Sequence, residues 1–205
     1  KLRTEGFSET FLPGDPLVVE LSAGSDIQGV EFDVKMHQFP DAESYIKVLS
    51  ERVKFYAERY GIRKDYAVDT TGLEEVSNYH GELLHQGGDS WGPSYAVLPD
   101  NMQEGYYVVT ISGNDQDGIP QFVQKLIQIR NLSVYTQSVN GDTLVWINDP
   151  SSGGALAGLT VTLTDSETGN KLEATTQDDG TARLLTGKTE SAQLQILRDG
   201  KPTYV

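Results

Sequence analysis

The stretch "GVEFDVKM", residues 29–36, decides the fold class of this chain. Its apolar side chains, Val30, Phe32, Val34 and Met36, alternate with charged ones. Successive side chains of a strand point to opposite faces of a sheet, so the alternation predicts an antiparallel strand that is buried on one face. Similar segments between loops rich in Gly, Pro, Asn and Asp predict an all-β fold, with strands at 17–21, 106–111, 122–129, 132–136, 143–147, 160–164, 172–176, 181–185 and 192–197.

One segment, 41–60, breaks this alternation and predicts an amphipathic helix. Asp41 suits the N-cap because its side chain can accept a free backbone N–H, and Gly61 suits the C-terminal stop. The apolar stripe either packs on the neighbouring sheet, which is the interpretation we favour, or forms a partner-binding face. Its residues recur at steps of three and four: Ile46, Leu49, Val53, Tyr56 and Tyr60. The opposite face carries the solvated charges Lys47, Glu51, Lys54 and Glu58.

The spacing of the strands divides the chain near Arg130. Residues 1–129 predict a β-sandwich that carries the helix as an insert, and residues 130–205 predict a second antiparallel sandwich of six or seven short strands. Tight hairpins are expected at Asn140-Gly141 and Asp199-Gly200, because these dipeptides tolerate positive φ angles. Almost no linker separates the two parts, so we expect a fixed relative orientation.

The composition excludes several classes of function. The formal net charge of −14 repels nucleic acid and anionic lipid, so neither is expected as a partner. Residues 1–129 hold 21 acidic and 10 basic residues, and residues 130–205 hold 9 and 6. The absence of cysteine removes disulfides, thiolate catalysis and Cys-ligated zinc. No run approaches the roughly 20 apolar residues that cross a bilayer, so this segment is not expected to insert into a membrane. The chain opens on Lys1, and we expect it to be a piece of a longer protein.

The motif "GDSWG", residues 88–92, satisfies the G-x-S-x-G pattern of serine hydrolases. A nucleophile elbow needs a buried strand before the serine and a helix after it. No strand-like apolar run precedes Ser90, and the residues from Pro93 onward indicate a turn and a strand. His80 and His85 could supply a base, but nothing in the sequence orients them. We therefore interpret Ser90 as part of a glycine-rich turn and predict no catalytic residue and no enzyme.

Metal and cofactor sites are not expected either. His80 and His85 are five positions apart, a spacing that shares no face in a helix or a strand, and Glu82 adds only a second ligand to His80. The loop "GNDQDG", residues 113–118, is similar to a calcium loop. An EF-hand would place Gly113 at the first ligand position and Gln124 at the last, where a bidentate glutamate belongs. A solvated hairpin loop is our interpretation, with a looser calcium loop as the alternative.

The aromatic residues suggest a second kind of site. Trp91, Trp146 and the tyrosines could build a platform on which sugars stack. Trp146 alternates with Leu144 in "TLVWIN", and we expect this pair to face the core. The glycosylation sequon Asn131-Leu132-Ser133 would matter only in a eukaryotic secretory setting.

Four stretches, taken in order, resemble macroglobulin domains. "FLPGDPLVVEL" (11–21) is similar to an opening strand, and "VLPDNMQEGYYVVTISG" (97–113) to a closing hairpin. "KLIQIRNLSVYTQSVNGDTLVWINDPSSGGALAGLTVTL" (125–163) resembles the passage between two domains, and "TTQDDGTARL" (175–184) a later hairpin. In the order of these features, the chain resembles the bacterial alpha-2-macroglobulin-like proteins. The chain departs from their pattern at Gly154-Ala155-Leu156, which replaces Lys-Pro, at Gln177, which replaces an aspartate, and in the helical insert.

The resemblance implies a non-enzymatic scaffold. Members of the family are large extracytoplasmic proteins built from strings of such sandwiches, and many trap proteases, often through a Cys-x-Glu-Gln thioester. This chain has no cysteine and cannot hold the thioester. The implied partners are other domains of a parent chain and proteases, in the periplasm or at a bacterial cell surface, with no cofactor. The alternative is a cell-surface adhesin or a carbohydrate-binding β-sandwich module.

Overall fold

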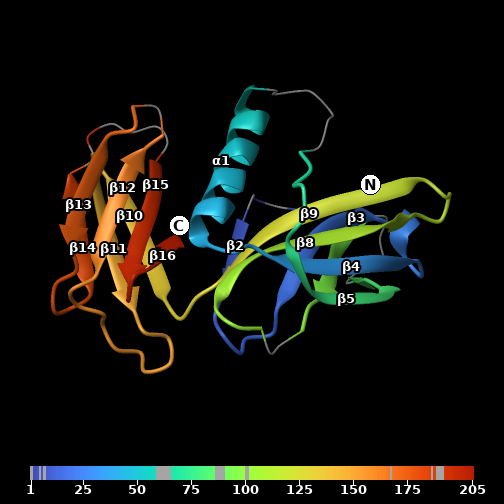
Figure 1. Cartoon of the computed structure of the whole chain (residues 1–205), viewed down its shortest axis with the longest axis horizontal. Coiled ribbons are helices and arrows are strands. Elements are labelled where there is room, and N and C mark those ends of the chain that lie inside the picture. Colours follow the sequence, from blue (N-terminus) through green and yellow to red (C-terminus); the bar gives the residue numbers. More distant parts are fainter. Residues whose placement is uncertain are drawn as a thin grey trace. The chain divides into compact units, whose positions relative to one another are not determined.

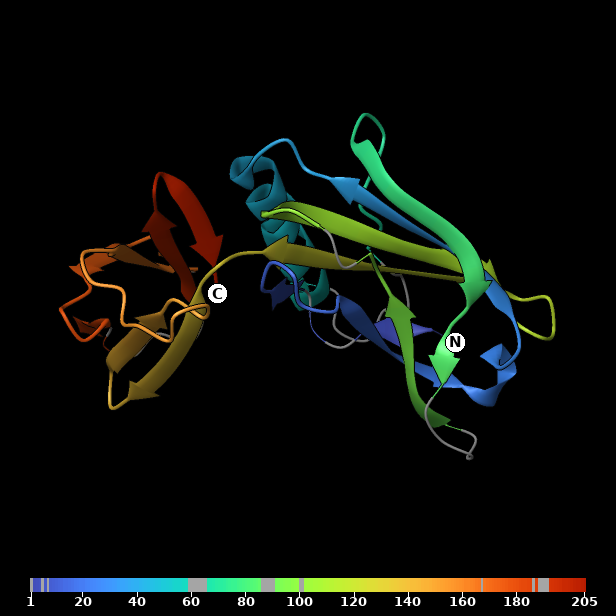
Figure 2. The same ribbon diagram turned by 90° about the horizontal axis from the view of Figure 1, so that it is seen from below.

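The computed structural model describes residues 2–4, 6, 8–58, 66–85, 91–99, 102–166, 168–185, 187 and 192–205. The chain divides into two compact units, Lys1–Ile129 (unit 1) and Arg130–Val205 (unit 2). Both units are built almost entirely from strands, with one long helix in unit 1 (Figure 1 and, turned by 90°, Figure 2). No helix of the described part is both long and apolar enough to span a bilayer.

Unit 1 contains two sheets that face each other across one core. The four-stranded sheet has the order β1 (Arg3–Thr4), β3 (Val18–Gly24), β7 (Trp91–Val97) and β6 (Leu84–His85). The five-stranded sheet has the order β2 (Ser8–Phe11), β9 (Pro120–Ile129), β8 (Gly105–Asn114), β4 (Glu31–Gln38) and β5 (Glu74–Glu82). A short 3₁₀-helix, η1 (Ser25–Ile27), follows β3. The described pairs are antiparallel, except that β2 runs parallel to β9.

The alternation in residues 29–36 produces strand β4 as predicted. Phe32, Val34 and Met36 are buried in the core, and the charged residues between them are exposed. Strand β8 is buried on both faces, because the four-stranded sheet covers one side and helix α1 (Ala42–Glu58) covers part of the other. Tyr107 therefore lies in the core, while Tyr106 packs on the helix residue Tyr45, with ring centroids 5.1 Å apart.

The predicted helix and its N-cap are confirmed. The Asp41 carboxylate accepts hydrogen bonds from the backbone N–H and the hydroxyl of Ser44, both at 2.7 Å. The predicted inward stripe is correct only in part, since Tyr56 lies beside β9 but Val53 does not face the sheet. The inward face is centred on Tyr45 and Arg52, which are seven residues apart, whereas Val53 is 41% exposed. The sheet below selects this face, since Tyr45 stacks on Tyr106 and the Arg52 guanidinium reaches a carbonyl of β9. Tyr60 and Gly61 lie outside the described residues.

Unit 2 is a seven-stranded sandwich in its described residues. Its three-stranded sheet has the order β10 (Ser133–Val139), β11 (Asp142–Asn148) and β14 (Thr181–Leu185). The four-stranded sheet has the order β13 (Lys171–Thr175), β12 (Thr160–Asp165), β15 (Ala192–Arg198) and β16 (Lys201–Tyr204). The core between the sheets is formed by Leu132, Val145, Ile147, Val161, Leu163, Ala182, Leu184, Leu194 and Ile196. The predicted fold class of two tandem β-sandwiches is confirmed.

The predicted hairpins of unit 2 adopt the expected backbone. Asn140 and Gly141 have φ angles of 52° and 86°, and the Asp199-Gly200 hairpin has the same two signs. At the turn before β14, the Asp179 carboxylate accepts hydrogen bonds from the N–H and the hydroxyl of Thr181. An aspartate side chain therefore stabilises this turn, although Gln177 departs from the family pattern two positions earlier.

Candidate functional site

The strongest candidate surface lies on unit 2, and it corrects one sequence-based expectation. Trp146 is 47% exposed and Leu144 is also exposed, so this pair faces solvent and not the core. Strand β11 carries two alternating apolar sets, and the structure buries the other one, Val145 and Ile147. The β-branched pair fills the space between the sheets, which leaves the larger indole on the outer face.

Strand register gathers the exposed apolar residues on one surface, the outer face of the β10–β11–β14 sheet. Tyr135, which is 59% exposed, lies directly opposite Trp146. Opposite residues of an antiparallel pair have Cβ atoms about 4.5–5.5 Å apart. Rows across this outer face are Tyr135–Trp146–Thr181, Gln137–Leu144–Arg183 and Val139–Asp142–Leu185.

The indole of Trp146 is held in place on this outer face. Its Nε1–H donates to the backbone carbonyl of Asp179 at 3.1 Å, across the turn that precedes β14. The two charged residues of the face, Arg183 and Asp142, pair with each other. An aromatic surface with a fixed indole and no unpaired charge can stack on a sugar ring or pack against an apolar protein surface.

From the sequence, Trp146 and the tyrosines were considered together for a platform, but the pairing of Trp146 with Tyr135 was missed. The signal for their pairing is the Asn140-Gly141 turn. A two-residue hairpin places Val139 opposite Asp142, and counting back along both strands brings Tyr135 opposite Trp146. Trp91 begins strand β7, but its side chain is not among those that the structure describes.

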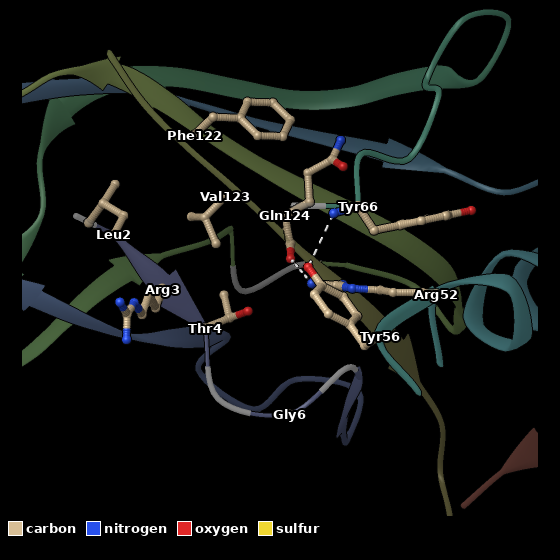
Figure 3. Close-up of a pocket in the computed structure, with 10 residues that line it drawn as sticks. All are labelled: Leu2, Arg3, Thr4, Gly6, Arg52, Tyr56, Tyr66, Phe122, Val123 and Gln124. Atoms are coloured by element: carbon tan, nitrogen blue, oxygen red, sulfur yellow. Dashed lines mark hydrogen bonds between the residues drawn. The ribbon is translucent and has the colours of Figure 1, made fainter. Parts of the chain in front are cut away.

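Unit 1 contains a cavity of about 470 Å³ between β1, α1 and β9 (Figure 3). Arg52 and Tyr56 project from the helix beside Gln124 of β9, and Leu2 lies at the opposite end in this view. Arg3 and Tyr66 also belong to the lining. These groups give the cavity a cationic and aromatic wall in an otherwise acidic protein.

The polar groups of this cavity serve to join segments of unit 1. Arg52 Nη2 donates to the backbone carbonyl of Gln124 at 2.8 Å, and Arg52 also hydrogen-bonds Tyr56. The Gln124 side chain accepts from the backbone N–H of Val68 at 2.6 Å and donates to its carbonyl at 3.1 Å. Burial lowers the pKa of Arg52, and the phenol oxygens of Tyr56, Tyr66 and Tyr45 counteract this shift. Arg52 and Gln124 therefore tie the helix, the sheet and the segment around Val68 together.

The two histidines considered from the sequence lie in different sheets. His80 on β5 is exposed and contacts two carboxylates of β4, Asp33 at 2.8 Å and Glu31 at 3.2 Å. The hydrogen bond with Asp33 raises the pKa of His80, and Glu31 adds to this effect. His85 on β6 hydrogen-bonds Ser94 through Nδ1 at 2.9 Å. Among the described residues, no group of three or more His, Asp or Glu side chains is arranged to hold a metal ion.

Three other motifs were considered from the sequence: the loop 113–118, the G-x-S-x-G stretch and the glycosylation sequon. In the loop 113–118, the Asp115 carboxylate accepts from the N–H groups of Asp117 and Ile119 and from the Gln121 amide. These bonds stabilise the β8–β9 hairpin. Ser90 lies outside the described residues, and strand β7 begins at Trp91, directly after it, where a nucleophile elbow would need a helix. In the sequon, Asn131 accepts a bond from Ser151 at 3.3 Å, and Leu132 is buried.

The fold places the chain in the class of tandem β-sandwich proteins, with a helix packed on the larger sheet of the first sandwich. Within that class, the chain is similar over its whole length to the NIE-MG1 fragment of Escherichia coli alpha-2-macroglobulin, with 17% identity, a TM-score of 0.65 and 95% of that chain covered. The resemblance to bacterial alpha-2-macroglobulin is thus confirmed for the fold.

Two further structures give similar comparisons. The MG0-NIE-MG1 fragment of the Escherichia coli protein matches with 15% identity and a TM-score of 0.63, and this chain spans 62% of its length. A Salmonella alpha-2-macroglobulin mutant matches with 13% identity and a TM-score of 0.59, and this chain spans 12% of it. All of this chain is covered in both cases. No protein-family model and no curated protein sequence matches the chain.

Proposed function

We propose that this chain is a non-enzymatic scaffold segment of a large extracytoplasmic alpha-2-macroglobulin-like protein and that it contributes to protease trapping. The observation that carries the proposal is the match of both units together, in one alignment, to a two-domain fragment of bacterial alpha-2-macroglobulin. The names in that fragment run NIE, then MG1, so we pair unit 1 with NIE and unit 2 with MG1. The periplasm or a bacterial cell surface is the location that this proposal entails.

The role of such a segment is to set the spacing and direction of its neighbours. Each unit has its own apolar core, so each can hold its shape without the other. The partners in this proposal are other domains of the parent chain and the proteases that the parent encloses. The segment itself takes no chemical step in trapping, since it has no cysteine for a thioester.

Reading the coding sequence on both sides of this segment tests the proposal. We expect further β-sandwich domains, followed by a bait segment, and a Cys-x-Glu-Gln motif if the trap is covalent. The full-length parent should then protect a captured protease from a large inhibitor while leaving it active on a small peptide substrate. A gene that encodes a cell-wall anchor within one or two domains would overturn the proposal.

A second candidate function is carbohydrate binding, as a surface adhesin module. The specific observation in its favour is that Tyr135 and Trp146 lie opposite each other and exposed, with the indole fixed by its bond to Asp179. Titration of soluble glycans with tryptophan fluorescence as the readout tests it. Binding predicts a saturable change that is lost in Tyr135→Ala. A flat response across a glycan array would exclude this function.

A further inference from the structure

Strand β10 is the end strand of its sheet and differs from the other end strands in its chemistry. Within the described residues, β10 pairs only with β11. Its sequence, "SVYTQSV", contains no Asp, Glu, Lys, Arg or His. Every other described strand that ends a sheet carries at least one such residue: Arg3 in β1, Glu9 in β2, Glu74 in β5, His85 in β6, Lys171 in β13, Arg183 in β14 and Lys201 in β16. Charges on an edge strand discourage the addition of a further strand, and β10 lacks them.

The hairpin geometry shows which backbone groups of β10 are available. A two-residue hairpin at Asn140-Gly141 closes on a hydrogen-bonded pair, Val139 with Asp142, and such pairs alternate along an antiparallel ladder. The N–H and C=O groups of Val134, Thr136 and Ser138 therefore point away from β11. Their regular spacing matches the backbone of another extended strand.

We propose that this edge pairs with the same edge of a second copy of the chain, so that two β10 strands join antiparallel about a two-fold axis centred on Thr136. This register places Thr136 opposite its copy and Val134 opposite Ser138 of the partner, so all three outward-facing residues pair. It also places Tyr135 opposite Gln137 of the partner. Both residues lie on the outer face, so the aromatic surface continues across the joint.

The charge distribution favours a second copy as the occupant. Unit 2 carries 9 acidic and 6 basic residues, against 21 and 10 in unit 1, so repulsion between copies is weakest for contact through unit 2. The nearest charged residues of the outer face, Arg183 and Asp142, pair with each other. An uncharged strand meets no like charge when it pairs with itself, whereas every other end strand except the two-residue β6 would bring a charged residue to the joint.

Sedimentation equilibrium of the full 205-residue chain, from low micromolar to about 1 mM, tests the proposal. We expect a monomer–dimer equilibrium. Thr136→Lys should raise the dimer Kd by at least about tenfold, because two ammonium groups would face each other at the two-fold axis. Thr175→Lys is the matched control, since Thr175 is also an exposed threonine on an end strand of unit 2, β13, and it should leave the Kd unchanged.

A cysteine variant keeps the test decisive if Thr136→Lys fails to fold. The chain has no cysteine, so Thr136→Cys introduces a single thiol that lies opposite its copy in the proposed dimer. The expected Cα separation of about 5.5 Å in such a pair suits a disulfide. Mild oxidation should yield a covalent dimer with Thr136→Cys and much less with Thr175→Cys. A monomer at every concentration, an unchanged Kd in Thr136→Lys, or equal cross-linking of the two cysteine variants would each overturn the proposal.

Discussion

Trp146 and Ile147 are neighbours in β11, but Trp146 faces solvent and Ile147 faces the core. Their substitution should therefore change stability by different amounts. Ile147 is fully buried in the core of unit 2, so Ile147→Ala should lower the free energy of unfolding by about 2–5 kcal/mol. Trp146→Ala should lower the free energy of unfolding by only about 1 kcal/mol, because the indole is already about half exposed and the substitution removes one hydrogen bond. Urea unfolding followed by circular dichroism measures both. If Trp146→Ala lowered the free energy of unfolding more than Ile147→Ala did, the indole would belong to the core.

His80 gives unit 1 a stability term that depends on pH. The groups facing it are Asp33 and Glu31, with Glu82 opposite Glu31 on the neighbouring strand. Its folded-state pKa is raised above 6.5 by Asp33, so the protonated ring stabilises the fold. The contribution is complete below the unfolded-state pKa and is lost as the pH rises through the raised, folded-state pKa.

We therefore expect His80→Gln to destabilise the chain more at about pH 6 than at about pH 9. Chemical denaturation at the two pH values measures the difference. The NMR titration of His80 supplies the control, in which Asp33→Asn should return its pKa toward 6.5. An equal loss of stability at both pH values would contradict this role.

At the scale of elements, Arg52 attaches the helix to the sheet of unit 1. The residue is 5% exposed, and its guanidinium satisfies the Gln124 carbonyl. Arg52→Ala removes the guanidinium donor from the buried Gln124 carbonyl. The free energy of unfolding should therefore fall by about 2–4 kcal/mol. Lys47→Ala, on the exposed side of the same helix, should change stability by less than about 0.5 kcal/mol. Thermal unfolding of the two variants compares them, and similar losses would show that Arg52 does not anchor the helix.

The elements also show which features a single sequence can predict. Residues 29–36 predicted β4 correctly. In a strand that is buried on one face, the alternation of apolar and charged residues itself shows which side chains face the core. The inward face of α1 was not predictable in this way. It depends on Tyr106 and on the Gln124 carbonyl, which lie more than 60 residues away in the sequence. Residues 142–148 carry apolar side chains on both faces, so the pattern alone could not decide between Trp146 and Ile147.

At the scale of the whole molecule, the junction is defined by two buried residues. Ile129 belongs to the core of unit 1 and Leu132 to the core of unit 2, so only two residues lie between anchored positions. A connection this short restricts the rotation of one unit against the other far more than a flexible linker does. We predict that the two units reorient together in solution.

Backbone ¹⁵N relaxation tests this prediction, with the Thr136→Lys variant used so that dimer formation does not alter the tumbling. Amides of β8 in unit 1 and of β12 in unit 2 should report one common rotational correlation time. Inserting Gly-Ser-Gly-Ser after Asn131 lengthens the junction without touching either core, and it should give each unit its own, shorter correlation time. Separate correlation times in the chain without the insertion would show that the units move independently, and a scaffold that sets the direction of its neighbours could not then rely on this junction.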